Sequence, residues 1–228
     1  MSESIVPVIT IDGPSGVGKG SLAQLLAVRL GWHLLDSGAL YRLAALAAAR
    51  CGIDLGDPRA VAAVARDLPV SFRAGQPGEP TAVLLDGEDV SRLIRTETCG
   101  RDASTVAAYP PVRQALLALQ RDFRRPPGLV ADGRDMGTVI FPDAPCKIYL
   151  TATARVRAER RFEQLKRQGE SVKLSHLLKE IEERDARDIG RAEAPLRPAD
   201  DAVIVDTSPL SLDEVLATVL DAWHRRVP

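Results

Sequence analysis

The amino-acid sequence predicts an α/β fold organised around a parallel β-sheet. Short runs rich in β-branched residues alternate with helical patterns along the 228 residues, and this alternation is typical of parallel sheets flanked by helices. The first run, Ile5–Ile11, leads through a glycine-rich turn, Gly13–Gly20, into an apolar helix. The alternation of strands and helices is interrupted around residues 70–90. There the tight-turn pair Asp86-Gly87 predicts a small antiparallel insert outside the main sheet.

The first half of the chain contains helical patterns with clear boundaries. The helix after the glycine-rich turn is expected to stop at Gly31, because glycine readily adopts the left-handed conformation that ends helices. Asp57 and Pro58 form an N-cap and first-turn pair for a short helix. The expected elements are a strand at 32–35, helices at 37–51 and 58–67, and strands at 70–72 and 81–85 joined by a loop rich in glycine and proline.

The second half returns to alternating strands and helices. Pro110-Pro111 favours the start of a helix, and Ser211 with Glu214 forms a capping box for the last one. The expected elements are helices at 96–108 and 110–125, strands at 129–131 and 147–150, charged helices at 155–167 and 174–191, a strand at 202–205 and a closing helix to about residue 224.

Composition excludes several classes of function. The formal net charge of −1 argues against a dedicated nucleic-acid-binding surface, which carries a basic excess. Hydrophobic residues make up 45% of the chain, yet no run approaches the roughly 18 apolar residues that span a bilayer. The N-terminus lacks the basic and apolar regions of a secretory signal. We therefore expect a cytoplasmic protein with no nucleic-acid or membrane partner.

Cysteine, histidine and tryptophan are interpreted as structural residues. The three cysteines are odd in number and far apart, which favours a reducing compartment over a disulfide framework and predicts buried thiols. The histidines lack the spacing of metal ligands, and the tryptophans are expected in the core. These residues are Cys51, Cys99, Cys146, His33, His176, His224, Trp32 and Trp223.

The segment from residue 13 to residue 21 is the most informative in the chain. It reads Gly13, Pro14, Ser15, Gly16, Val17, Gly18, Lys19, Gly20 and Ser21. Because it follows a strand and opens a helix, it predicts a P-loop, whose backbone N–H groups surround phosphates. Lys19 is expected to reach the β- and γ-phosphates, and Ser21 to offer its hydroxyl to phosphate or Mg²⁺. Gly20 stands where the standard pattern has serine or threonine.

Two charged clusters follow predicted strands, at the sheet edge where α/β proteins bind ligands. In the first, Ser37 can cap a helix, while Arg42 either binds a phosphate or lies exposed. In the second, Asp132, Arg134 and Asp135 form either a ligand site or a polar turn.

A third charged cluster lies near the end of the predicted helix at 174–191. Arg184, Asp188 and Arg191 are spaced i, i+4 and i+7, which predicts that they share one helix face, with Arg187 beside them. The alternative is a solvated helix held by surface ion pairs.

Taken together, these motifs resemble those of bacterial cytidylate kinases. The matching segments are ITIDGPSGVGKGS, LLDSGALYR, ADGRDMGTVIFPDAP and ERDARDIGRAEAPL, in that order, and the resemblance spans residues 5–225. It implies a three-layer α/β/α P-loop NTPase fold in a single domain of residues 1–228. The implied parts are a core of residues 1–36, 97–154 and 192–228, a monophosphate-binding lobe with the insert at about 37–96, and a helical lid at about 155–191.

The same resemblance implies roles for individual residues. Ser104, Arg113 and Asp135 would recognise cytosine, and Arg42, Arg134 and Arg191 would bind the acceptor phosphate. Ser37 belongs to the same CMP site, Arg184 and Asp188 would contact the sugar, and Arg187 would approach the transferring phosphoryl group. Lys19 and the arginines at 134, 184, 187 and 191 form the implied catalytic set. Mg²⁺ would arrive as Mg-ATP near Ser21, with Asp132 holding its water shell.

The implied reaction moves the γ-phosphate of ATP to CMP or dCMP and gives ADP with CDP or dCDP, in a monomeric enzyme. One alternative is a sibling P-loop kinase for UMP, AMP or a metabolite such as shikimate. Another is a regulatory or nucleic-acid-dependent NTPase, which the balanced charge disfavours. A binding module without catalysis would be expected to lack Lys19 or the arginine cluster, and both are present.

Overall fold

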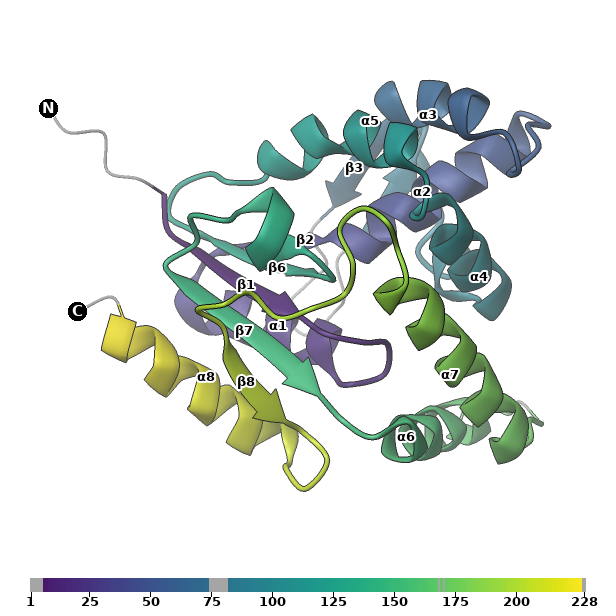
Figure 1. Ribbon diagram of the computed structural model, residues 1–228. Helices are drawn as coiled ribbons and strands as arrows, with labels where there is room; N and C mark the ends of the chain where they lie inside the picture. Colours follow the sequence, from purple (N-terminus) through teal and green to yellow (C-terminus); the bar gives the residue numbers. More distant parts are fainter. Residues whose placement is uncertain (1–5, 74–81, 168, 170, 227–228) are drawn as a thin grey trace, which may run out of the picture. The chain divides into compact units, whose positions relative to one another are not determined.

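The computed structural model describes residues 6–73, 82–167, 169 and 171–226. The chain divides into two compact units, the first made of residues 1–36 and 121–228 and the second of residues 37–120 (Figure 1). The division into core, lobe and lid stays a prediction. Ile5, Thr81 and most of the predicted Gly/Pro-rich loop lie outside the described residues.

A five-stranded parallel sheet forms the centre of the first unit. Its strand order is β2-β6-β1-β7-β8, and every neighbouring pair runs parallel. The strands are β1 (Val8–Asp12), β2 (His33–Asp36), β6 (Leu129–Gly133), β7 (Cys146–Thr151) and β8 (Val203–Asp206). This confirms the predicted α/β class, and it brings the carboxyl ends of β1, β2 and β6 to one edge.

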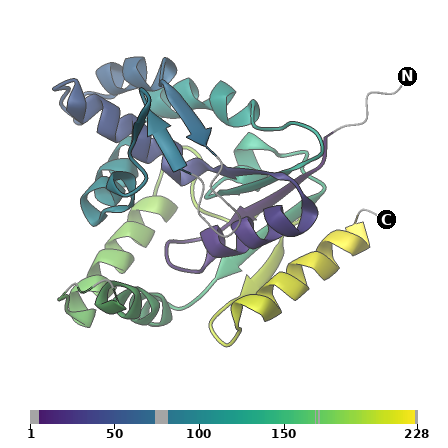
Figure 2. The same ribbon diagram turned by 180° about the vertical axis from the view of Figure 1, so that it is seen from behind.

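Helices α1 (Lys19–Leu30) and α8 (Leu212–Arg226) pack on one face of this sheet (Figure 2). Ile9 and Ile11 of β1 meet Leu22 and Leu26 of α1, all with no exposed surface. Burying such side chains stabilises the fold by about 1.5–3 kcal/mol each. Gly31 ends α1 in the left-handed conformation, with φ 66°, as predicted.

The opposite face of β1 carries polar side chains, because successive strand residues alternate between faces. Thr10 and Asp12 therefore point away from α1, toward the short π-helical turn Met136–Ile140. The sequence did not predict this turn. Its wider hydrogen-bond pattern is rare and is often found at functional sites.

The remaining helices of the first unit are α6 (Ala154–Arg167) and α7 (Leu174–Ile189). They share a small apolar core around Leu165 and Leu177. The prediction that α7 extends to Arg191 is wrong: the helix ends at Ile189 and Gly190 follows as its C-cap.

The second unit combines helices with the predicted antiparallel insert. A three-stranded sheet, β3-β4-β5, is hydrogen-bonded separately from the main sheet. Asp86 and Gly87 turn the chain with φ of 51° and 79°, the positive angles that a tight hairpin requires. The strands are β3 (Val70–Arg73), β4 (Ala82–Leu85) and β5 (Glu88–Asp89).

Most helix boundaries of the second unit follow their sequence signals. Asp57 caps α3 by accepting hydrogen bonds from the N–H groups of Arg59 and Ala60. The C-terminal end of the α5 pattern was predicted too late, at residue 125 instead of Arg121. The helical segments are α2 (Ser37–Arg50), α3 (Pro58–Arg66), the 3₁₀ turn Leu93–Arg95, α4 (Glu97–Val106) and α5 (Pro110–Arg121).

The cysteine and tryptophan predictions have mixed outcomes. Cys99 and Cys146 are buried, whereas Cys51 is exposed just after α2, so the prediction for it is wrong. Trp223 belongs to the main core, as predicted, whereas Trp32 is only partly buried and packs against it, edge to face with Trp223 at a ring-centroid distance of 5.0 Å. In the described part of the chain, no helix combines the length and apolar character needed to cross a membrane.

The tryptophan pair provides a test of the core. A Cβ atom added at Gly128 would lie 2.4 Å from Trp32 Cδ2, so Gly128→Ala should force the indole to move. We expect the free energy of unfolding to fall by about 1–3 kcal/mol, as for other overpacked cores. Urea unfolding followed by circular dichroism measures it, and fluorescence of the chain's two tryptophans reports the displacement.

Gly56→Ala is the matched control, because the three atoms nearest to its Cβ would belong to the exposed carboxylate of Asp54 rather than to a packed ring. An unchanged unfolding midpoint in Gly128→Ala would contradict the packing described here.

Candidate active site

The segment between β1 and α1 has the backbone of a phosphate-binding loop. Gly13 has φ 146°, and a Cβ atom there would lie 2.2 Å from the carbonyl oxygen of Leu150, so no larger residue fits. Gly18 precedes the helix with φ 94°, and no side chain caps the helix start. The N–H groups of the first turn therefore create a positive end that favours an anion.

Lys19 lies at the centre of this loop. Its side chain is 6% exposed, and Nζ donates a hydrogen bond to the carbonyl of Pro14 at 2.8 Å. Burial lowers the pKa of Lys19, the charge of Arg134 lowers it further, and Asp132 acts in the opposite direction. A bound polyanion would favour the charged lysine, because it supplies the countercharge that the free site lacks.

Asp132 faces the start of α1 from the end of β6. Its Oδ2 would lie 3.6 Å from a Cβ atom at Gly20, and it is paired in register with Asp36 of β2. Burial raises the pKa of Asp132, Lys19 lowers it, and Asp36 raises it. Within the described residues, no group of three or more His, Cys, Asp or Glu could hold a metal ion by itself.

Asp188 holds two of the predicted arginines together. Its Oδ2 accepts a hydrogen bond from Arg134 Nε at 3.0 Å, and its Oδ1 accepts one from Arg191 Nη2. The Asp188 side chain is 1% exposed. Burial alone would raise its pKa, but Arg134, Arg191 and Arg184 together hold it below its usual value.

The arginines of the third cluster do not all share one helix face. Arg191 lies beyond the end of α7, and it reaches Asp188 from the segment that follows. Arg184 Nη1 donates to Ser15 Oγ in the loop at 3.4 Å, while Arg187 is exposed on α7. The structure thus brings Lys19, Asp132, Arg134, Arg184, Asp188 and Arg191 together in the first unit.

Four of the predicted binding residues belong to the second unit. The predicted capping role of Ser37 is wrong: its buried hydroxyl instead donates to Gln120 Oε1 at 2.7 Å. Arg42 Nη1 donates to the carbonyl of Ile94 at 2.6 Å, so this arginine is held against the 3₁₀ turn that precedes α4.

Ser104 and Arg113 are both buried in the second unit. The guanidinium of Arg113 lies over the Tyr41 ring, 5.8 Å from its centroid. Ser104 Oγ has no hydrogen-bond partner among the described residues, although the side chain is only 3% exposed. A buried hydroxyl without a partner is costly, which makes Ser104 a candidate to bind a ligand.

A comparison with protein families matches residues 9–225 to the cytidylate kinase model. The chain belongs to the cytidylate kinase family. A cytidylate kinase of Stutzerimonas stutzeri (strain A1501) is 59% identical over 94% of each chain. One from Pseudomonas putida (strain W619) is 59% identical over 98% of each, and one from Shewanella baltica (strain OS155 / ATCC BAA-1091) is 55% identical over 100% of this chain and 98% of its own.

Two further charged residues of this cytidylate kinase family member were not singled out from the sequence. Arg157 of α6 is 3% exposed and donates to the carbonyl of Ser15 at 3.1 Å. Both oxygens of Asp185 on α7 accept from the same guanidinium. This ion pair joins α6, α7 and the phosphate-binding loop. Nothing in the spacing of Arg157 and Asp185 indicated it, since the contact is tertiary.

Asp12 is the third residue that the sequence analysis missed. Its carboxylate accepts hydrogen bonds from the backbone N–H groups of Met136 and Gly137, both at 2.8 Å. Burial raises the pKa of Asp12 to about 7. Its place directly before Gly13 was a signal, because a carboxylate at the end of a buried strand needs a partner.

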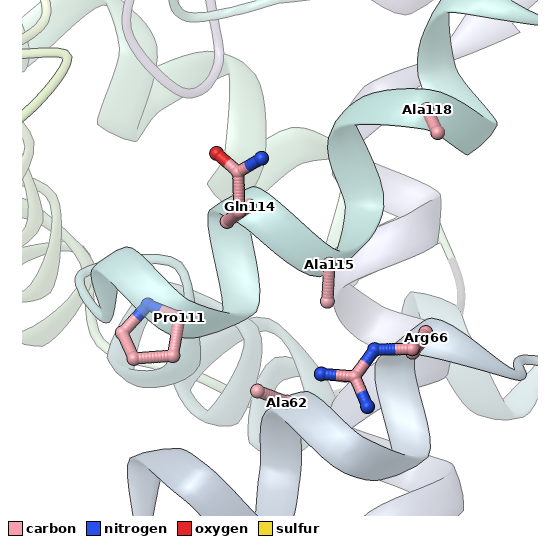
Figure 3. A pocket seen from close by; sticks show the side chains of 6 residues that line it. All are labelled: Ala62, Arg66, Pro111, Gln114, Ala115 and Ala118. Atoms are coloured by element: carbon pink, nitrogen blue, oxygen red, sulfur yellow. The ribbon is translucent and has the colours of Figure 1, made fainter.

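A hollow of about 480 Å³ lies elsewhere, between α3 and α5 of the second unit (Figure 3). None of its lining residues is a predicted site residue. They are Ala62, Arg66, Pro111, Gln114, Ala115 and Ala118.

The Asp188 contacts predict a pH-dependent loss of stability. Asp188→Asn removes the negative charge between Arg134 and Arg191, so the free energy of unfolding should fall by about 3 kcal/mol at neutral pH. The folded pKa of Asp188 lies below 3.8. The wild-type stabilisation is therefore present above that value and is lost as pH falls through the folded pKa.

Denaturant unfolding of both proteins between neutral pH and about pH 2 measures this difference. The gap between them should narrow as pH falls, because the wild-type protein loses the negative charge of Asp188 when pH falls through its folded pKa. Glu182→Gln, on the exposed side of α7, is the control. A gap that persists unchanged in acid would contradict the assigned charge effect.

Proposed function

We propose that the chain transfers the γ-phosphate of ATP to CMP or dCMP and so forms ADP and CDP or dCDP. The observation that carries this proposal is the gathering of Lys19, Arg134, Arg184 and Arg191 around the phosphate-binding loop. Such an excess of cations suits two mutually repelling phosphate groups. Membership of the cytidylate kinase family supports the choice of nucleotide.

The loop from Gly13 to Ser21 binds the phosphates of ATP. Lys19 exchanges its hydrogen bond to Pro14 for the β- and γ-phosphates, where its positive charge is favoured. Mg²⁺ bound with ATP would be held near Ser21 and Asp132 and would supply positive charge that offsets the charge of the phosphates. The residues fit this ion, because Ser21 is exposed in the first turn of α1 and Asp132 faces that turn. Both offer the oxygen ligands that Mg²⁺ prefers.

The acceptor phosphate is bound by Arg42, Arg134 and Arg191. The last two are already oriented by Asp188, so little side-chain freedom remains to be lost on binding. Arg184 and Asp188 contact the sugar. Arg187, which is exposed on α7, approaches the transferring phosphoryl group.

Cytosine is recognised by Ser104, Arg113 and Asp135. A carboxylate accepts from the exocyclic amino group of cytosine, and an arginine donates to its ring carbonyl and N3. Uracil lacks that amino group and could not make this contact to the buried Asp135, which discriminates strongly. The hydroxyl of Ser104, which has no hydrogen-bond partner in the part of the chain that the structure describes, supports this assignment.

No general base is needed for this transfer. The acceptor phosphate has a second pKa of about 6, so its attacking oxygen is already largely deprotonated at neutral pH. Catalysis then consists of aligning donor and acceptor and of cancelling their repulsion with Lys19 and the arginines. Residues 155–191 act as a lid that excludes water, the competing acceptor. The enzyme acts as a cytoplasmic monomer whose partners are its two nucleotides.

A coupled assay with ATP, Mg²⁺ and a panel of CMP, dCMP, UMP and AMP tests the proposed function. ADP should form rapidly with CMP or dCMP and far more slowly with UMP and AMP. Preference for AMP or UMP would indicate a sibling kinase. ATP hydrolysis independent of any monophosphate would contradict the proposal.

Arg191→Ala should reduce turnover far more than ATP affinity. Removing one of the cations that bind the acceptor phosphate should lower kcat by about 100-fold or more. ATP affinity should change little, because the loop that binds ATP keeps its residues. Steady-state kinetics with CMP and equilibrium binding of ATP measure the two effects separately. Arg29→Ala, an exposed change at the distal end of α1, is the control. A loss confined to ATP affinity would contradict the assignment.

A further inference from the structure

Asp12 occupies a junction between two parts of the first unit. Its backbone is the last residue of β1 and continues into Gly13 of the phosphate-binding loop. Its side chain is 5% exposed and leaves the opposite face of the strand from Ile9 and Ile11. The backbone of Asp12 therefore leads into the phosphate-binding loop, whereas its side chain lies on the other face of the sheet.

The two carboxylate oxygens of Asp12 are used separately. Oδ1 accepts from Met136 N and Oδ2 from Gly137 N, each at 2.8 Å. Met136 and Gly137 open the π-helical turn, and Asp135 immediately precedes them. The peptide units that follow Asp135 are consequently held by an acid at the end of the neighbouring strand.

The surroundings leave this segment little room to move. A Cβ atom at Gly137 would lie 2.9 Å from Thr10 Oγ1, and one at Gly133 would lie 2.8 Å from Met136 Cε. Gly133 is also paired in register with Asp12 itself. The stretch from Gly133 to Gly137, which carries Arg134 and Asp135, is thus anchored at both ends on β1.

We propose that Asp12 is a positioning residue that holds the Met136 and Gly137 backbone so that Asp135 and Arg134 meet the monophosphate in one orientation. The inference rests on the proposed function, because it assigns Asp12 an effect on the cytosine-recognising Asp135. Asp12 itself touches neither nucleotide in this scheme. It connects the loop that binds the donor with the segment that recognises the acceptor.

Only an ionised carboxylate offers two equivalent acceptors at this spacing. Asparagine keeps the shape but replaces one oxygen with an N–H₂ group, which would face the N–H of Met136 or Gly137. Two donors pointing at each other cannot form a hydrogen bond. Burial makes the charge costly here and raises the pKa of Asp12, whereas the hydrogen bonds from Gly137 and Met136, and to a lesser degree Lys19, favour the ionised form.

Asp12→Asn tests the inference through substrate discrimination. Loss of one charge-assisted hydrogen bond corresponds to about a tenfold change. We expect KM for CMP to rise about tenfold, and the ratio of kcat/KM for CMP over UMP to fall by a similar factor. ATP affinity should change less than about twofold, because the loop backbone is retained.

The matched control is Asp143→Asn, an isosteric change at an exposed carboxylate that pairs with Arg124. It should leave the CMP-over-UMP ratio as in the wild type. An Asp12→Asn protein with wild-type KM and ratio would overturn the inference, and so would an equal loss toward CMP, UMP and ATP. Failure of the wild-type protein to phosphorylate CMP would instead overturn the proposed function.

Hydrogen exchange of the wild-type protein provides a test that does not depend on the variant folding. The amides of Met136 and Gly137 should exchange slowly without any nucleotide, because Asp12 already binds both. Rapid exchange at these two amides in the free protein would show that the contact is not maintained, and the inference would fail.

Discussion

Repulsion among cations is the constraint on which the rest of this site depends. Burial lowers the pKa of Lys19, and the positive charges of Arg134 and Arg184 lower it further, so both effects favour the neutral lysine. The buried carboxylates of Asp132 and Asp12 partly offset this repulsion at Lys19, and a bound polyanion would complete the neutralisation.

Three carboxylates organise the first unit around this cluster, and each does so through a different kind of contact. Asp188 binds two arginine side chains, Asp185 binds the buried Arg157, and Asp12 binds backbone N–H groups. All three join segments that are distant in the sequence. A site that must hold highly charged ligands in register needs such rigid support, since small displacements of a charged group lose much of the stabilisation.

The glycine-rich loop, most elements and the main cluster of arginines could be predicted from sequence, because their signals are local. Asp57 before Pro58, Gly31 after an apolar helix and Asp86-Gly87 between strands each act within a few residues, and the structure bears them out. The π-helical turn after Asp135 and the early end of α7 were not predicted. The first depends on a contact from elsewhere in the chain, because Asp12 holds the turn. The second has a local cause, since Gly190 follows Ile189 as the C-cap of α7.

The sequence by itself determined the class of the protein: an α/β fold with a P-loop and the ordered motifs of the cytidylate kinase family. These features are encoded in short segments whose residue types and spacing suffice to identify them. Only the tertiary structure decided which charges are partners, that Ser104 is buried without a hydrogen-bond partner among the described residues, and that Asp12 faces Met136 and Gly137. The reason is that pairing and burial depend on distances between segments far apart in the sequence, such as Asp12 and Gly137, which are 125 residues apart, and no local pattern specifies these distances.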